Sequence, residues 1–385
     1  MGKLNFAKKT LSHFIRGYEV YNTIEVSRKA LLFNSEFFKK QTNHQIIPVL
    51  KGNAYGHGIE VVAEAIKGQD FPYVAVDGYF ESLKVHEVNK HQQVLVMGMI
   101  KPKNISRLHL KNKAFVVHDV SSIKAYGDLH KPIKLHLEIN TGMNRYGISK
   151  NELAEYLKLI ASYPKLMLEG VMSHLADADG ADENTVNDAL KLFEQCVEQI
   201  RDAGFTPTYI HIGQSAGSMR LKSKIINASR IGIGFYGINP FPSDHPLYTR
   251  CQKLKPVLTL KSTITETHTL SKGDKVSYNY TFTAPKKMKI GVLPLGYHEG
   301  VNRDLSNQEF VKIGSQFCPI VGRVCMNHTM IDITNTDAKV GDEVTVYSAD
   351  SSDKNSIMST ADDYGLFTYR LLTSLSPDVR RTLVP

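Results

Sequence analysis

Residues 168–212 read LEGVMSHLADADGADENTVNDALKLFEQCVEQIRDAGFTPTYIHI and contain one complete strand–helix–strand unit. Leu168–Met172 and Tyr209–Ile212 are short apolar runs of the kind that form buried strands. Between them, apolar residues recur with the 3.6-residue period of a helix over Asn184–Ala203, and Gly204 is placed to end it. Two buried strands joined by a helix are typical of a parallel α/β fold.

The same alternation of apolar runs and helical patterns extends over about 230 residues. Seven or eight strands favour a TIM-type (β/α)8 barrel over a doubly wound sheet. The dinucleotide-binding alternative is weakened because no G-x-G-x-x-G follows an early strand. The other five predicted strands are Ile46–Leu50, Val74–Val76, Val94–Met97, Phe115–Val117 and Leu135–Ile139.

The pattern changes from about Cys251 onward, where segments rich in Thr, Val, Leu and Ile predominate. Val257–Leu270 predicts one long strand or two short ones. Tight Gly-Asp turns between β-rich segments are typical of a compact all-β domain. We therefore expect a barrel domain at residues 1–250 and a mainly-β domain at residues 251–385. Further β-like segments are Lys289–Pro294, Phe310–Ile313 and Ile320–Ile333, the turns are Lys272–Val276 and Val340–Val344, and Ser356–Leu375 predicts a short helix and a tail.

The composition is that of an ordinary globular protein, with 42% hydrophobic and 22% charged residues. The net charge of +9 is spread along the chain, which suits an enzyme that binds phosphate and carboxylate groups. Charge alone does not decide against nucleic acid, but we expect no nucleic-acid partner. Residues 1–20 contain no apolar run long enough for a signal peptide, no apolar run in the chain reaches about 18 residues, and the four cysteines lack zinc spacing. We therefore expect a cytoplasmic protein with no membrane contact and no metal site.

Side chains capable of chemistry follow several of the predicted strands. Catalytic groups of a TIM barrel lie at the C-terminal ends of its strands. Lys51 directly follows Ile46–Leu50, and His174 follows Leu168–Met172. The other side chains at such positions are Glu138, Arg145, Gln214 and Ser215.

Lys51 is the most unusual of these residues because its stem emerges from a buried strand. A buried lysine is costly unless it is neutralised or used. The loop Gly52–Gly58 follows, and its three glycines allow a ligand to approach the backbone closely. A desolvated lysine can form a Schiff base with a carbonyl. The alternative is a surface lysine whose stem covers apolar surface.

A second glycine-rich stretch is Ser229–Gly237, in which glycines alternate with apolar residues. Such a stretch can expose backbone N–H groups to a phosphate. The alternative is that these glycines only form tight turns and bind no phosphate.

Together these segments resemble the alanine racemase family, whose members bind pyridoxal 5′-phosphate (PLP) in a TIM-type barrel that is followed by a β domain. Lys51 with Asn53–Gly58 is similar to the family's PLP-lysine motif, and Thr141–Arg145 to its Thr-Gly-Met-x-Arg motif. The resemblance spans roughly residues 21–380. Further matches are Val276–Tyr278, which is similar to the segment with the second catalytic base, Gly296-Tyr297, Gly322–Met326 and Tyr369.

The resemblance implies a homodimer that racemises alanine and supplies D-alanine for cell-wall peptidoglycan. Lys51 would hold PLP through a Schiff base and move a proton on one face of the substrate Cα. Tyr278 from the other subunit would serve the opposite face, because one base cannot easily serve both. His174 would hydrogen-bond near Tyr278 and lower its pKa, since a free tyrosine is a poor base at neutral pH.

The resemblance also assigns binding roles. Arg230 would face the pyridine nitrogen and leave it unprotonated, because an arginine does not give up its proton. The ring is then a weaker electron sink, which suppresses transamination. Arg145 and the backbone of Met326 would receive the substrate carboxylate, and Tyr297 and Tyr369 would restrict the substrate to alanine or serine. The phosphate would be bound by Tyr55, Ser215, Gly232, Ile233 and Tyr369.

Several positions depart from the family pattern. Glu138 stands seven residues before Arg145, where many members have a carbamylated lysine. We expect Glu138 to replace the carbamate as a bidentate partner of Arg145, with a solvent-facing strand glutamate as the alternative. The other departures are Gln214, Asn279, His298, Glu299 and Asn327.

Three other functions remain open. A racemase of broader range, acting on serine, lysine or arginine, differs only in the pocket volume. A decarboxylase of the same barrel type usually pairs a glutamate with the pyridine nitrogen, whereas this chain offers Arg230. A non-catalytic PLP carrier has a single barrel, so the β domain with Tyr278, Met326 and Tyr369 counts against it.

Overall fold

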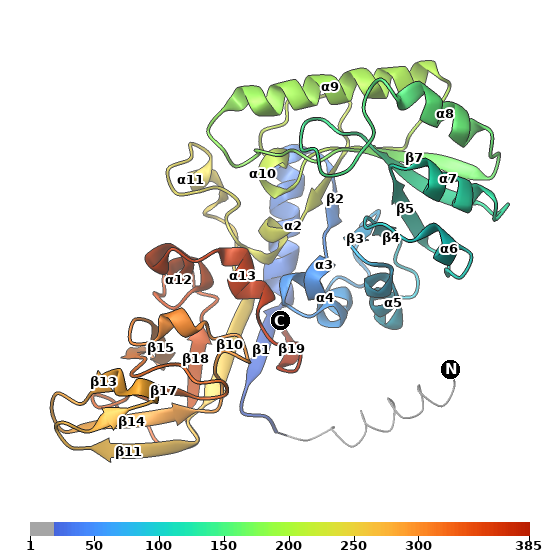
Figure 1. Ribbon diagram of the computed structural model, residues 1–385. Helices are drawn as coiled ribbons and strands as arrows, with labels where there is room; N and C mark the ends of the chain where they lie inside the picture. Colours follow the sequence, from blue (N-terminus) through green and yellow to red (C-terminus); the bar gives the residue numbers. More distant parts are fainter. Residues whose placement is uncertain (1–18) are drawn as a thin grey trace. The chain divides into compact units, whose positions relative to one another are not determined.

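The computed structural model describes residues 19–385, and it contains the expected barrel of parallel strands (Figure 1). Strands β3 to β8 form one parallel sheet in sequence order, and β2 pairs with β9. A bridge between Val49 and Ala75 joins β2 to β3. The backbone hydrogen bond from Asn227 N to Ile210 O, 3.1 Å, joins β9 to β8, so the ring of eight strands is closed. The strands are β2 (Gln45–Pro48), β3 (Val74–Val76), β4 (Val94–Val96), β5 (Lys113–Val117), β6 (Ile133–Glu138), β7 (Leu166–Met172), β8 (Tyr209–His211) and β9 (Ala228–Ile231).

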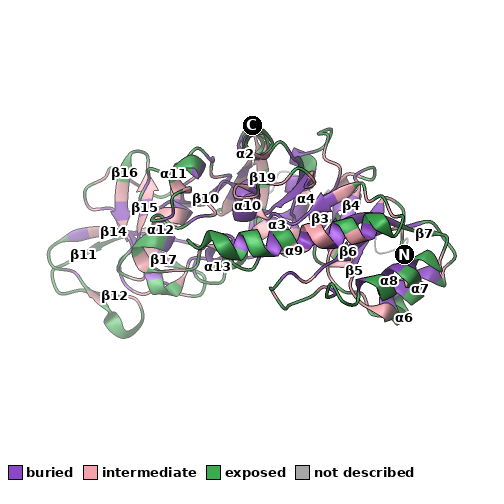
Figure 2. Cartoon of the chain, turned by 90° about the horizontal axis from the view of Figure 1, so that it is seen from above, coloured by how far each residue is buried: buried purple, intermediate pink, exposed green. Residues whose placement is uncertain are grey.

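Helices surround the barrel, as βα connections require. Helix α9 (Glu183–Asp202) matches the predicted helix, and buried and exposed residues alternate along it (Figure 2). Asp182 caps α9 by accepting from the amide of Asn184 at 2.9 Å. The other helices of this region are α2 (Arg28–Thr42), α3 (Lys51–Tyr55), α4 (Ile59–Ala65), α5 (Tyr79–Val88), α6 (Pro102–Ile105), α7 (Val120–Gly127), α8 (Leu153–Ala161), α10 (Ser215–Ser218), η1 (Ile233–Tyr236) and α11 (Tyr248–Cys251).

The later part of the chain is mainly β, as expected. Val257–Leu270 forms two strands, β10 (Leu258–Thr263) and β11 (Glu266–Leu270). Both predicted Gly-Asp turns have a glycine in the left-handed region, with φ of +95° at Gly273 and at Gly341. The other elements are β12 (Lys275–Val276), η2 (Tyr278–Tyr280), β13 (Phe282–Thr283), β14 (Met288–Leu293), η3 (Arg303–Leu305), β15 (Phe310–Ile313), β16 (Gln316–Pro319), β17 (Thr329–Asp332) and β18 (Glu343–Tyr347).

Four segments differ from the sequence prediction. Strand β9 overlaps the start of the glycine-rich stretch Ser229–Gly237 and was not predicted as a strand. Ile320–Ile333 forms a strand only at β17, because its first part forms turns around Gly322. Strand β1 (Thr23–Ser27) was not predicted. The predicted helix and tail are two helices and a strand, α12 (Ile357–Tyr364), α13 (Thr368–Thr373) and β19 (Arg380–Val384), and β19 pairs with β1 at the edge of the sheet β16-β15-β18-β10-β1-β19.

The chain forms two compact units, which we call the barrel unit and the β unit. The barrel unit contains Val26–Leu258, Ala349–Ser374 and Leu383–Pro385. Among the described residues, the β unit contains residues 19–25, Thr259–Ser348 and Leu375–Thr382. Helices α12 and α13 thus belong to the barrel unit, although they follow the β unit in sequence. Compactness does not show which segments fold alone, so a domain boundary at residue 250 stays a prediction.

Of the helices in residues 19–385, none combines the length and the apolar character that a membrane crossing requires. The prediction that residues 1–20 contain no signal peptide falls mostly on residues outside the described part of the chain.

Candidate functional site

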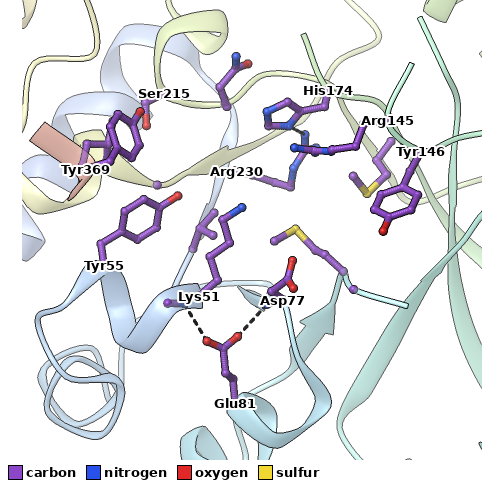
Figure 3. Close-up of a pocket in the computed structure, with 18 of the residues that line it drawn as sticks. Lys51, Tyr55, Asp77, Glu81, Arg145, Tyr146, His174, Ser215, Arg230 and Tyr369 are labelled. Atoms are coloured by element: carbon purple, nitrogen blue, oxygen red, sulfur yellow. Dashed lines mark hydrogen bonds between the residues drawn. The ribbon is translucent and has the colours of Figure 1, made fainter. Parts of the chain in front are cut away.

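A cavity of about 920 Å³ opens in the barrel unit, where the side chains that follow the strands meet (Figure 3). This volume is within the range of small-molecule sites. Ten of the predicted site residues line the cavity. Several of them, such as Lys51 and His174, were predicted because they follow a barrel strand, which we call the strand-end rule. The ten residues are Lys51, Tyr55, Glu138, Arg145, His174, Ser215, Arg230, Gly232, Ile233 and Tyr369.

Lys51 begins a turn with left-handed backbone geometry. The φ angles of Gly52, Asn53, Ala54 and Tyr55 are +63°, +54°, +55° and +51°. Consecutive non-glycine residues in this region are strained, and such strain is found at functional sites. The turn replaces the open loop expected from the glycines.

Glu81 of helix α5 accepts hydrogen bonds both from this turn and from the end of β3 (Figure 3). One carboxylate oxygen accepts from the amide of Gly52 at 2.7 Å, and the other accepts from the amides of Asp77 at 2.9 Å and Gly78 at 3.1 Å. Backbone amides that donate to an ionised carboxylate form strong hydrogen bonds. Glu81 therefore fixes the position of the backbone next to Lys51.

The surroundings of Lys51 favour its neutral, nucleophilic form. Burial lowers the pKa of its amine, the charge of Asp77 opposes this shift, and Arg145 and Arg230 add to it. A larger share of the amine is therefore unprotonated at neutral pH than for an exposed lysine. This is the state that attacks a carbonyl.

Arg230 is buried on β9, and carbonyls and imidazoles fix its guanidinium. Nη1 lies 2.6 Å from His211 Nδ1 and 3.0 Å from His211 O, and Nη2 donates to Ser173 O at 2.6 Å. Burial lowers the pKa of Arg230 to about 10, although the charge of Glu138 opposes this shift. The guanidinium is therefore protonated at neutral pH and can only donate.

His174 is neutral in this setting. Burial, together with the charges of Arg230, Arg145 and Lys51, lowers its pKa to about 3. Its Nδ1 lies 3.4 Å from Arg230 Nη2, which makes Nδ1 the acceptor and assigns the proton to Nε2. His174 therefore offers one N–H donor and carries no charge.

Three of the residues predicted to bind phosphate, Tyr55, Ser215 and Tyr369, lie on one side of the cavity (Figure 3). A Cβ at Gly232 would lie 2.5 Å from Tyr55 Oη, so only glycine allows this approach. The amide of Gly234 donates to Ser215 Oγ at 3.1 Å. Burial raises the pKa values of Tyr55 and Tyr369, the latter to about 12, so both keep hydroxyl donors.

Glu138 does not make the contact expected of it. Its Oε2 lies 3.4 Å from His118 Nδ1, and the ring of His118 stacks on Tyr146. Within residues 19–385, Glu138 and Arg145 form no ion pair. Glu138 is buried on β6 and Arg145 is exposed, so the solvent-facing alternative for Glu138 is also wrong.

Tyr278, Tyr297 and Met326 belong to the β unit, and each is exposed there. Tyr278 is 66% exposed on η2, where Asn279 has φ of +60°. Asparagine adopts this conformation more readily than most residues, so Asn279 suits this position. The expected meeting of these three residues with a cavity stays a prediction.

Two departures from the family pattern contact each other in the β unit. Asn327 Nδ2 donates to Glu299 Oε1 at 2.7 Å, and Glu299 Oε2 accepts from the amide of Gly296 at 2.7 Å. The amide of His298 donates to Met326 O at 2.9 Å. Glu299 therefore places a carboxylate next to Asn327, which follows Met326 in the sequence.

Three acidic residues that were not predicted also line the cavity, namely Asp77, Glu81 and Asp179. Asp77 directly follows Val74–Val76, so the strand-end rule that identified Lys51 also applies to it. Glu81 and Asp179 lie farther from their strands and had no comparable signal.

The comparisons with known proteins cover most of the chain. The N-terminal domain profile of alanine racemases matches residues 26–240, and their C-terminal domain profile matches residues 257–383. An alanine racemase from Staphylococcus carnosus (strain TM300) is 32% identical, over 94% of this chain and 94% of its own. One from Lactobacillus acidophilus is also 32% identical, over 95% of this chain and 98% of its own.

Solved structures give the same result. An alanine racemase from Clostridium difficile 630 superposes with a TM-score of 0.87 at 25% identity, over 95% of this chain and 96% of its own. An alanine racemase from Bacillus anthracis, whose structure has L-Ala-P bound, superposes with a TM-score of 0.86 at 28% identity, over 96% of each chain. Because both domains match in order and the likeness extends over nearly the full length, this chain belongs to the alanine racemase family of enzymes.

Proposed function

We propose that this protein uses PLP to interconvert L- and D-alanine. The observation that carries this proposal is the setting of Lys51, a half-buried amine of lowered pKa in a cavity that also contains Arg145 and Arg230. An amine of lowered pKa close to two arginines suits a cofactor with an aldehyde and a phosphate.

The residues present fit PLP. Lys51 would hold it covalently, and Arg230 would donate to the ring nitrogen. Because Gly232 has no side chain, the Tyr55 hydroxyl lies close to this backbone, and both can contact one phosphate group. When bound, PLP supplies an electron sink for the charge that develops at the substrate Cα. The phosphate group is assigned to Tyr55, Ser215, Gly232, Ile233 and Tyr369.

Racemisation requires proton transfer on both faces of Cα. The Lys51 amine takes or returns the proton on one face. On the other face, we assign this role to the partner subunit's Tyr278, which makes the active form a homodimer. Neutral His174 can donate to that tyrosine's oxygen and so stabilise its ionised form.

The substrate is a small amino acid. Arg145 and the backbone of Met326 would bind its carboxylate, while Tyr297 and Tyr369 would limit its side chain. A second candidate is a broader range that includes lysine or arginine, because the carboxylates of Asp77 and Asp179 line the cavity. We assign the protein to the cytoplasm, where it would supply D-alanine for peptidoglycan.

The test is a D-alanine assay on purified protein supplied with PLP and L-alanine. We expect D-alanine to form, and Lys51→Ala to abolish both its formation and the visible absorption of bound PLP. Racemisation of lysine faster than alanine would favour the second candidate. Folded protein that binds no PLP would refute the proposal.

A further inference from the structure

Behind Arg230, a row of buried polar side chains crosses the barrel interior. His211 on β8 is the first, and its Nδ1 lies 2.6 Å from Arg230 Nη1. His211 Nε2 lies 2.8 Å from Nδ1 of His136 on β6. His136 Nε2 then faces Oε2 of Glu169 on β7 at 3.6 Å, slightly longer than an ordinary hydrogen bond. Both histidines are 0% exposed, and the proposed reaction uses neither of them.

The ends of this row allow only one arrangement of protons. A guanidinium only donates, and an ionised carboxylate only accepts. Burial lowers the pKa of both His211 and His136, so each ring is neutral and carries one proton. Because Arg230 donates to His211 Nδ1, the proton of His211 is on Nε2 and points at His136 Nδ1. The proton of His136 is then on Nε2, toward Glu169.

Glu169 is held in the acceptor state by its own surroundings. Lys134 Nζ lies 2.7 Å from Glu169 Oε1, and the hydroxyl of Tyr73 donates to Oε2. Burial raises the pKa of the carboxyl, but the contacts with His136, Lys134 and Tyr73 outweigh it and lower the pKa to about 2. Glu169 is therefore ionised at neutral pH.

The backbone is shaped around this row. The register of β6 and β7 passes from Leu135–Leu168 to His136–Gly170, which leaves Glu169 as the extra residue of a bulge. Bulges redirect side chains and are frequent next to active sites. A Cβ at Gly170 would lie 2.3 Å from His136 Nδ1, so glycine is needed for the ring to fit.

We propose that Glu169 is a positioning residue that holds Arg230 in place as a donor, through the two histidines between them. The contacts along this row are all between side chains of the protein and involve no cofactor. Only the identity of the group that Arg230 faces, the cofactor's ring nitrogen, rests on the proposed function.

Glu169→Gln is expected to reverse the direction of hydrogen-bond donation between His211, His136 and residue 169. Lys134 only donates, so the amide oxygen of the new side chain faces Lys134 and its NH2 group faces His136. His136 Nε2 must then accept, which moves the protons of both rings to Nδ1. His211 consequently presents an N–H to Arg230, and the hydrogen bond between them is lost.

The first test is imidazole 15N NMR of the protein without added cofactor at pH 7, with signals assigned by His136→Gln and His211→Gln. In the wild type, both rings are expected to be neutral with the proton on Nε2. Glu169→Gln is expected to move both protons to Nδ1, whereas Glu169→Asp, which keeps an acceptor, retains the wild-type state. Glu64→Gln, which removes an exposed ion pair with Lys67 at 3.3 Å, is the matched control and changes neither ring.

If either ring in the wild type has its proton on Nδ1, or has both nitrogens protonated, the proposed arrangement of protons is wrong. This conclusion holds even if every variant misfolds. Unchanged tautomers of His136 and His211 in folded Glu169→Gln also contradict this arrangement.

The second test is made on the PLP-loaded protein. Glu169→Gln is expected to shift the visible spectrum of bound PLP and to raise the ratio of transamination to racemisation about tenfold, the effect of losing one charge-assisted partner. Glu169→Asp is expected to restore both. Reversed tautomers with an unchanged spectrum and ratio overturn the positioning role. A wild-type protein that binds no PLP refutes the proposed function. The NMR result still tests the arrangement of protons between Arg230 and Glu169 in that case.

Discussion

At the scale of single residues, Gly232 gives the most direct test of the phosphate side of the cavity. In Gly232→Ala the new methyl would lie 2.5 Å from Tyr55 Oη, so the tyrosine must move. Overpacking of this kind costs about 1–3 kcal/mol, and we expect PLP to bind about tenfold more weakly. A PLP titration followed by absorption measures this. Gly291→Ala, where the nearest atoms lie at 3.5 Å, is the control, and equal affinities in the two variants would contradict the assignment.

His174 links the site to the pH dependence of folding. Its pKa is about 3 in the folded protein and 6.5 when exposed, so between these values the unfolded chain binds more protons. Its contribution therefore makes the free energy of unfolding fall as the pH falls from 6.5 to about 3. Urea unfolding across this window should show a smaller fall in His174→Gln than in the wild type. The same substitution at exposed His91 controls for the loss of a histidine, and parallel curves for wild type and His174→Gln would disprove the claim.

At the scale of elements, the Lys51–Tyr55 turn depends on helix α5. Glu81→Ala leaves the amides of Gly52, Asp77 and Gly78 without their acceptor. We expect the free energy of unfolding to fall by about 1–3 kcal/mol and PLP to dissociate faster. Glu60→Ala, which removes an ion pair between exposed side chains at 3.6 Å, should cost at most about 1 kcal/mol. Similar losses in the two variants would show that the turn does not need Glu81.

The elements also show what sequence patterns can predict. The strand-end rule predicted that Lys51, His174 and Ser215 lie near one another, and they line one cavity because the side chains after parallel strands meet on one face. It could not recognise β9, where a buried arginine interrupts the apolar pattern that marks the other strands.

Partners across the barrel were not predictable for a related reason. Glu138 contacts His118 instead of Arg145, and His136 meets Glu169 only because a bulge shifts the register of β7. Such pairs depend on side-chain direction and register, which no local pattern contains.

At the scale of the whole molecule, the proposed chemistry divides between the barrel unit with Lys51 and the β unit with Tyr278. The central claim is that these two residues act as a pair from different subunits. The most direct measurement combines Lys51→Ala and Tyr278→Phe chains, co-expressed with different tags and purified as the mixed dimer. Each variant alone should be inactive. The mixed dimer should regain about half the wild-type rate of D-alanine formation, because one of its two sites has both bases. A mixed dimer as inactive as its parents would contradict the account.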